Sequence, residues 1–77
     1  MYKYSICNMP DEEIYKKQCV ALEKHIPGLK KGNELTDVDY SKVQEYFLDG
    51  KRITVHNSFY IGAVYIKSEV ELAQFFK

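Results

Sequence analysis

The sequence contains no tryptophan, only two cysteines, and no surplus of either charge, since 11 Lys and Arg balance 11 Asp and Glu. This balance argues against electrostatic binding of nucleic acid, which needs a surplus of basic residues to meet several phosphates. It argues equally against an acidic mimic of DNA. Two cysteines are too few for a disulfide scaffold, so we expect Cys7 and Cys19 to be small buried residues rather than a bridged pair.

Long apolar runs are also missing. No stretch approaches the ~20 apolar residues of a membrane span, and no apolar segment of the kind found in secretion signals follows the first residues. We therefore expect a cytoplasmic protein with no membrane partner. The chain has 77 residues, 45% of them apolar, which suits one folded domain over residues 1–77, and no linker or repeat divides it.

The first third of the chain predicts a strand followed by a helix. Residues 2–7 alternate between two faces, which is the period of a half-buried strand. A helix over residues 10–25 follows, with Asn8 or Met9 as its cap and acidic residues in its first turn. Its apolar positions recur every three or four residues, so one face packs, and Pro27-Gly28 ends it.

The middle of the chain predicts a loop and then a hairpin. Residues 30–39 are polar and contain Gly32, so we expect a loop that Leu35 and Val38 anchor to the core. Residues 41–48 fit either a short helix or a strand. The Asp49-Gly50 pair that follows is a strong hairpin signal, and we therefore predict a strand here.

The last third predicts two strands and a helix. Residues 51–56 and 59–67 are rich in β-branched and aromatic residues, and we expect a two-residue turn at Asn57-Ser58 between them. Ser68 and Glu71 have the spacing of a capping box, which predicts a final helix over residues 69–76, with Leu72, Ala73 and Phe76 on one face.

These elements predict a two-layer α+β domain of order β-α-β-β-β-α, with a mainly antiparallel sheet and helices on one face. Two-residue turns fix the register and pair Leu48 with Lys51, Tyr46 with Ile53, Val55 with Tyr60, and Ile53 with Gly62. The face under the helices is then Gln44, Tyr46, Leu48, Ile53, Val55, Tyr60, Gly62, Val64 and Ile66. The opposite face is Val43, Glu45, Phe47, Arg52, Thr54, His56, Phe59, Ile61, Ala63, Tyr65 and Lys67.

The opposite face is the predicted site, because aromatic residues and arginine on an exposed sheet are typical of the centre of protein interfaces. We expect a partner to contact Phe47, Arg52, His56, Phe59, Ile61, Tyr65 and Lys67. The alternative is that Phe47, Phe59 and Tyr65 are covered by residues 30–39 or by the chain ends and form a second small core.

The sequence predicts no catalytic or metal site and no cofactor. The two histidines, His25 and His56, and the two cysteines lack the short spacings of zinc ligands. No nucleophile motif or glycine-rich phosphate loop is present. The acidic pair Asp37 and Asp39 falls in the predicted loop, where the sequence shows no cleft to use it.

We therefore predict a small non-enzymatic protein-binding module, such as an inhibitor, immunity protein or regulatory adaptor of bacterial or phage type, or a homo-oligomer formed through the same face. The alternative is a module that binds single-stranded nucleic acid by stacking bases on Phe47, Phe59 and Tyr65. Two segments, residues 7–10 (Cys-Asn-Met-Pro) and residues 60–66 (Tyr-Ile-Gly-Ala-Val-Tyr-Ile), loosely resemble the sheet motifs of RNA-recognition domains. Their stacking positions fall on Ser5, Ile61 and Ala63, so we assign no family.

Overall fold

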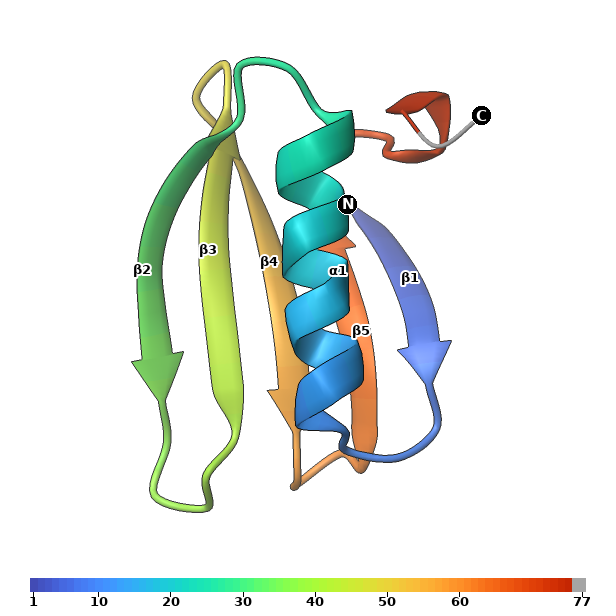
Figure 1. The fold of residues 1–77 in the computed structure, drawn as a ribbon, viewed down its shortest axis with the longest axis vertical. Helices are drawn as coiled ribbons and strands as arrows, with labels where there is room; N and C mark the ends of the chain where they lie inside the picture. Colours follow the sequence, from blue (N-terminus) through green and yellow to red (C-terminus); the bar gives the residue numbers. More distant parts are fainter. Residues whose placement is uncertain (76–77) are drawn as a thin grey trace.

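The computed structural model describes residues 1–75, in which a five-stranded antiparallel sheet carries one helix on one face (Figure 1). The elements are β1 (Tyr2–Cys7), α1 (Glu12–His25), β2 (Lys30–Thr36), β3 (Lys42–Leu48), β4 (Lys51–Ser58), β5 (Ala63–Ser68) and a 3₁₀ turn, η1 (Ala73–Phe75). The strands lie in the order β1-β5-β4-β3-β2, so β1 and β2 are the two edges. The α+β class is confirmed, whereas the predicted order β-α-β-β-β-α is wrong because β2 replaces a loop and η1 replaces a helix.

Helix α1 begins at Glu12 rather than at residue 10 because Asp11, not Asn8 or Met9, is its cap. The Asp11 carboxylate accepts a hydrogen bond from the Ile14 backbone N–H at 3.0 Å, which satisfies one of the unpaired donors of the first turn. The helix ends at His25, as predicted. Gly28, with φ of 79°, follows in the left-handed conformation that glycine adopts without strain.

Replacing Asp11 by alanine is expected to lower the free energy of unfolding by about 1 kcal/mol, because the Ile14 N–H loses its acceptor and the helix dipole loses a negative charge. Urea unfolding followed by circular dichroism measures the change. Asp11→Asn is the matched control, since its side-chain oxygen still caps the helix, and it should cost a few tenths of a kcal/mol. An equal loss for both variants would contradict the cap.

The β3–β4 hairpin has the predicted form. Residues 42–48 are a strand, and Asp49 and Gly50 have φ values of 52° and 79°, as the tight hairpin turn requires. The predicted pairs Tyr46 with Ile53 and Leu48 with Lys51 are both present. This turn therefore fixes which side chains of β3 and β4 face the helix.

The predicted register between β4 and β5 is wrong. Val55 pairs with Ile66 instead of Tyr60, and Ile53 pairs with Ser68 instead of Gly62. Asn57 and Ser58 belong to β4, because the buried side chain of Asn57 accepts a hydrogen bond from the Asp11 N–H. The turn instead spans residues 59–62 and closes with a hydrogen bond from the Gly62 N–H to the Ser58 carbonyl oxygen at 2.9 Å.

Residues 30–36, predicted as part of a loop, form the edge strand β2. It pairs with β3 along one side only, and its register shifts between Lys31 and Glu34, where Gly32 lies. A Cβ on Gly32 would lie 2.9 Å from the ring of Phe47, so the strand needs glycine at this point. Leu35 and Val38 do not anchor this segment to the core, since they are 52% and 95% exposed.

The predicted C-terminal helix is also wrong over the described residues. The Ser68 hydroxyl accepts from the Val70 N–H instead of capping a helix at Glu71. The Leu72 N–H donates to the Tyr4 hydroxyl at 2.9 Å, which ties the following segment to β1, and only the short η1 forms. Phe76, predicted to lie on the helix face, is outside the described residues.

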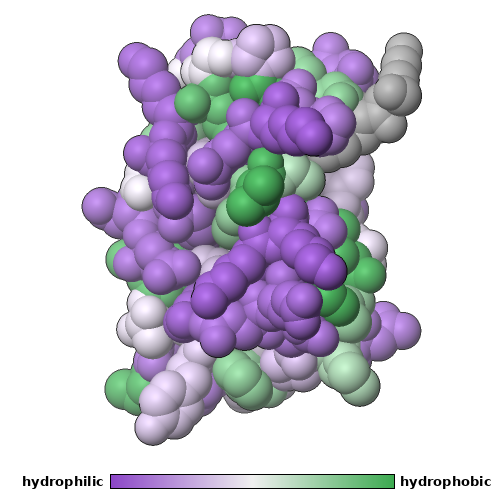
Figure 2. Space-filling model, in the orientation of Figure 1, coloured by the Kyte–Doolittle hydropathy of each residue, from purple (hydrophilic) through white to green (hydrophobic). Residues whose placement is uncertain are grey.

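The core lies between α1 and the inner face of the sheet. Its most buried members are Tyr15, Leu22, Ile26, Tyr46, Ile53, Val55, Val64, Ile66 and Leu72. The predicted inner residues of β3, β4 and β5 belong to this layer, whereas Tyr60 and Gly62 lie in the β4–β5 turn and Tyr60 is 92% exposed. Figure 2 shows that the surface on the helix side is largely hydrophilic, with apolar residues in separate spots.

Candidate binding face of the sheet

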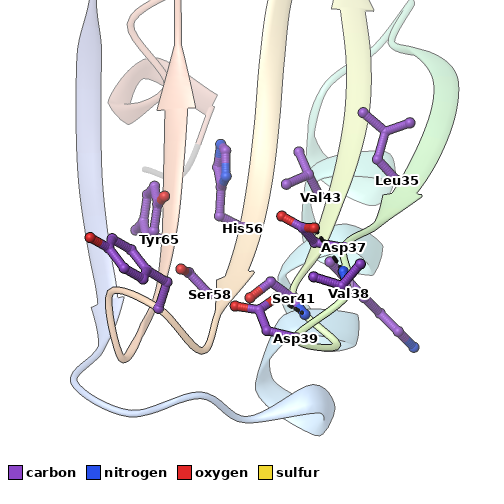
Figure 3. Close-up of a pocket in the computed structure, with 11 residues that line it drawn as sticks. Leu35, Asp37, Val38, Asp39, Ser41, Val43, His56, Ser58 and Tyr65 are labelled. Carbon is purple, nitrogen blue, oxygen red and sulfur yellow. Dashed lines mark hydrogen bonds between the residues drawn. The ribbon is translucent and has the colours of Figure 1, made fainter.

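The face of the sheet opposite α1, here called the outer face, is covered by no element of residues 1–75 (Figures 1 and 3). The strand registers place on it Lys3 and Ser5 of β1, Lys30 and Leu35 of β2, Val43, Glu45 and Phe47 of β3, Arg52, Thr54, His56 and Ser58 of β4, and Ala63, Tyr65 and Lys67 of β5. A sheet with one helix has only this second face to offer as a broad surface.

The structure brings five of the predicted site residues together on this face: Phe47, Arg52, His56, Tyr65 and Lys67. The other two, Phe59 and Ile61, lie in the β4–β5 turn and are 51% and 54% exposed. They were placed on the face by the wrong register. They therefore lie outside the outer face, and Phe59 borders a small hollow with Glu12, Lys42 and Asn57 on the helix side of the sheet.

Tyr65 is on the outer face but is only 5% exposed. Its ring stacks on the ring of His56, with centroids 4.5 Å apart and an angle of 6° between the planes. The ammonium groups of Lys3 and Lys67 lie 5.0 and 5.8 Å from its centroid, within the range of cation–π attraction. Tyr65 is therefore buried like a member of a small second core, as the alternative interpretation expected, whereas Phe47 is 38% exposed.

His56 lies in a positive, partly buried environment. Burial and the neighbouring cations Lys67, Arg52 and Lys3 lower the pKa of its imidazole to about 4. Its Nε2 atom lies 2.8 Å from the Thr54 hydroxyl oxygen, which also lies 3.4 Å from the Lys67 carbonyl oxygen. At neutral pH His56 is therefore an uncharged aromatic ring that packs and hydrogen-bonds.

A hollow of about 390 Å³ opens on the outer face near the β2–β3 loop (Figure 3). His56 and Tyr65 border it from β4 and β5, while Leu35, Asp37, Val38, Asp39 and Val43 border it from β2, β3 and the loop between them. Asp37 and Asp39 hold this loop, because their carboxylates accept from the backbone N–H groups of Val38 and Ser41 at 2.7 and 3.1 Å. The hollow has apolar walls. Its rim is acidic because the ammonium group of Lys42, which also borders it, is paired with Glu12.

The serine, histidine and aspartate side chains at the hollow are held by structural contacts rather than by each other. The Ser58 hydroxyl accepts from the Ile61 N–H at 3.1 Å, and the Ser41 hydroxyl accepts from the Phe59 N–H at 2.8 Å. The first bond closes the β4–β5 turn, the second ties this turn to the β2–β3 loop, and the ring nitrogen of His56 contacts Thr54. Nucleophilic catalysis needs a hydroxyl in contact with a base, whereas these two hydroxyls accept hydrogen bonds from the backbone.

Comparisons with protein-family models, with curated proteins and with solved structures find no match to this chain. The function must therefore be argued from the site itself. Residues 1–75 contain no cluster of three or more histidine, cysteine or acidic side chains able to hold a metal ion. Within the same residues, no helix has the length and apolar character needed to cross a membrane.

The sequence interpretation missed Lys3, Lys30, Leu35, Asp37 and Asp39 as members or neighbours of the candidate face. Lys3 was assigned a side of β1 but no place beside β5, because the pairing of the first and last strands is not encoded locally. Asp37 and Asp39 were noticed as a pair, but their loop had no known position. Recognising residues 30–36 as a strand would have placed all of the β2 and loop residues.

Proposed function

We propose that this chain is a small non-enzymatic binding module whose partner is a protein and whose binding surface is the outer face. One observation carries the proposal: the fold leaves this face uncovered although it holds apolar side chains. Leu35 is 52% exposed, and Phe47, which pairs with Arg52, is 38% exposed. Exposed apolar and aromatic groups next to arginine are enriched at the centre of protein interfaces, where excluding water stabilises the complex.

Rigidity of the centre of the face supports the same function. The stacked pair of His56 and Tyr65 is fixed by its neighbours, and the Arg52 Nε atom lies 3.0 Å from a Glu45 carboxylate oxygen. A partner would meet side chains that are already ordered, so association loses little side-chain entropy. An inhibitor, immunity protein or adaptor acts in this way, by occupying a surface of its partner. The free thiols Cys7 and Cys19 fit the reducing conditions of the cytoplasm, where we place the protein.

Single-stranded nucleic acid is the second candidate, because Lys3, Arg52 and Lys67 lie together on the face. Two features count against it. The Tyr65 ring is too covered to stack on a base, and the acidic rim at Asp37 and Asp39 would repel phosphates. A protein partner explains the apolar side chains as well as the charges.

An acidic side chain in the middle of the face is expected to abolish binding. In affinity capture from a lysate of the source organism, Val43→Asp should retain less than a tenth of the protein that the wild type retains, because a charge in an apolar interface is desolvated without a partner. Val20→Asp is the matched control, since Val20 is 62% exposed on α1 at the other side of the molecule.

Nuclease treatment of the lysate separates the two candidates. A protein retained by the wild type and by Val20→Asp after nuclease treatment, and lost by a folded Val43→Asp variant, supports the proposal. Loss of all retained material on nuclease treatment would give first place to nucleic acid. Equal retention by Val20→Asp and Val43→Asp would place the binding surface elsewhere on the molecule.

A further inference from the structure

Apart from Glu45, which is paired with Arg52, the outer face carries its positive and negative charges at opposite ends. Lys3 pairs with Lys67, and Lys30 pairs with Phe47, which in turn pairs with Arg52. These four cations therefore lie at the end of the sheet that carries the β3–β4 turn, here called the basic end. Asp37 and Asp39 lie in the β2–β3 loop at the other end, here called the acidic end (Figures 1 and 3).

The two ends are too far apart to neutralise each other within one molecule. The acidic end adjoins the start of β3, where Lys42 pairs with Asn57. Along β4, Asn57 lies five positions from Arg52 and three positions from Thr54, which pairs with Lys67. At about 3.4 Å per residue these separations are about 17 and about 10 Å. Both exceed the Debye length of about 8 Å at physiological ionic strength, so each end keeps its own potential.

Local contacts leave most of these charges available. Arg52 is paired with Glu45, but Lys3 and Lys67 lean on the uncharged ring of Tyr65. Asp37 and Asp39 accept hydrogen bonds from backbone N–H groups, which carry no net charge. The net charge of the chain is zero, so two copies have no overall repulsion to overcome.

We propose that the protein bound by the outer face is a second copy of this chain, in a two-fold dimer that sets the basic end of each copy against the acidic end of the other. The inference rests on the proposed function of the outer face. In a two-fold dimer the contact between a basic end and an acidic end occurs twice, once on each side of the axis. Charge also selects the orientation, because the opposite arrangement would bring the four cations of one copy against those of the other.

The size and composition of the face suit such a dimer. Viewed as in Figure 1, the molecule extends over 31 by 24 Å between Cα atoms. The area of a face with these dimensions is comparable to the ~800 Å² that each partner contributes to a standard interface. Leu35, Val43 and Phe47 would supply apolar contact between the charged ends. The hollow in front of Leu35 and Val43 offers room for side chains of the second copy.

Sedimentation equilibrium tests the dimer directly. The wild type is expected to dimerise with a dissociation constant between about 1 and 200 µM. Raising NaCl from 50 to 500 mM should increase this constant at least tenfold, because salt screens exposed charges. Asp37→Asn/Asp39→Asn should weaken it at least tenfold at low salt, since the amide oxygens still hold the loop while both charges are lost. Glu13→Gln/Glu71→Gln is the control, because it removes the same number of negative charges at exposed positions outside the outer face, and it should leave the dissociation constant unchanged.

Exchanging the charges gives the sharper result. Asp37→Lys/Asp39→Lys has two positive ends, and Lys3→Glu/Lys30→Glu/Lys67→Glu has two negative ends, since only Arg52, which is paired with Glu45, stays positive at its basic end. Each variant is therefore expected to be monomeric alone. Mixed in equal amounts they should form a heterodimer, because every charged contact is then complementary. Circular dichroism establishes that each variant is folded, and the asparagine pair decides the question if a lysine variant is not.

Two outcomes would overturn the dimer: a wild type that remains monomeric at 200 µM, or asparagine and charge-exchanged variants that associate like the wild type. The proposed function is then judged separately by the capture experiment. Retention of another protein, lost in Val43→Asp, would leave the outer face as a binding surface for a different partner. A monomer that retains nothing would remove both proposals.

Discussion

Replacing Tyr46 by alanine is expected to lower the free energy of unfolding by about 3–5 kcal/mol, as for other buried aromatic residues. Tyr46 is 0% exposed in the middle of β3, and its ring packs in the core under α1. A domain of this size is stable by roughly 4–12 kcal/mol in total. The variant should therefore be close to unfolded at 37 °C, which urea or thermal unfolding followed by circular dichroism will measure.

Two matched variants separate packing from hydrogen bonding at this position. The Tyr46 hydroxyl donates to a Glu23 carboxylate oxygen at 2.5 Å, and Glu23 remains 43% exposed. Tyr46→Phe should cost only about 1 kcal/mol, because water and Lys31 still solvate the carboxylate. Tyr60→Ala, at a 92% exposed tyrosine, should stay within about 0.5 kcal/mol of the wild type. A phenylalanine variant as unstable as the alanine variant would contradict the packing argument.

The elements that the sequence predicted are those whose signals are local. Residues 2–7 form β1 as predicted, although a register shift between Ser5 and Cys7 interrupts their alternation. The Asp49-Gly50 turn gives the register of β3 on β4 without reference to the rest of the chain. The end of α1 was also found, because Pro27-Gly28 stops a helix wherever it lies. Capping by Asp11 instead of Asn8 moved only the helix start.

The failures are elements that depend on tertiary contacts. Residues 30–36 have few apolar side chains, and they form β2 because an edge strand needs only one hydrogen-bonded neighbour. Asn57 has the composition of a turn residue, yet its hydrogen bond from the Asp11 N–H keeps it in β4. Ser68 fits a capping box, but the bond from Leu72 to the Tyr4 hydroxyl directs the chain along β1 instead.

The prediction of the candidate site was right where the strand register was right and wrong where the register was wrong. Phe47 and Arg52 were placed correctly because the β3–β4 register was right, while Phe59 and Ile61 were misplaced with the β4–β5 turn. The separation of charges on the outer face could not be predicted from the sequence. It requires Lys3 to lie beside Lys67, which depends on the pairing of β1 with β5. Strand order between distant segments is the information that local patterns do not carry.

Lowering the pH is expected to destabilise the protein through His56. The folded-state pKa of His56, about 4, lies below the ~6.5 of an unfolded chain, because burial and the cations Lys67, Arg52 and Lys3 oppose its protonation. Protons thus bind the unfolded chain first, and stability falls as the pH drops from about 6.5 to about 4. The full difference would be about 3 kcal/mol, and partial exposure of the ring reduces our expectation to about 1–2 kcal/mol.

Comparison with His56→Gln isolates this contribution, because glutamine does not titrate and its amide still hydrogen-bonds to the Thr54 hydroxyl. Urea unfolding at pH 7, 6, 5 and 4 should show the wild type losing about 1–2 kcal/mol more than the variant over this range. All other titrating groups are shared, so their effects cancel in the difference. Equal losses in the two proteins would mean that His56 accepts a proton as readily in the folded state as in the unfolded chain. Burial and the cations Lys67, Arg52 and Lys3 would then not oppose protonation of the His56 ring as the structure indicates.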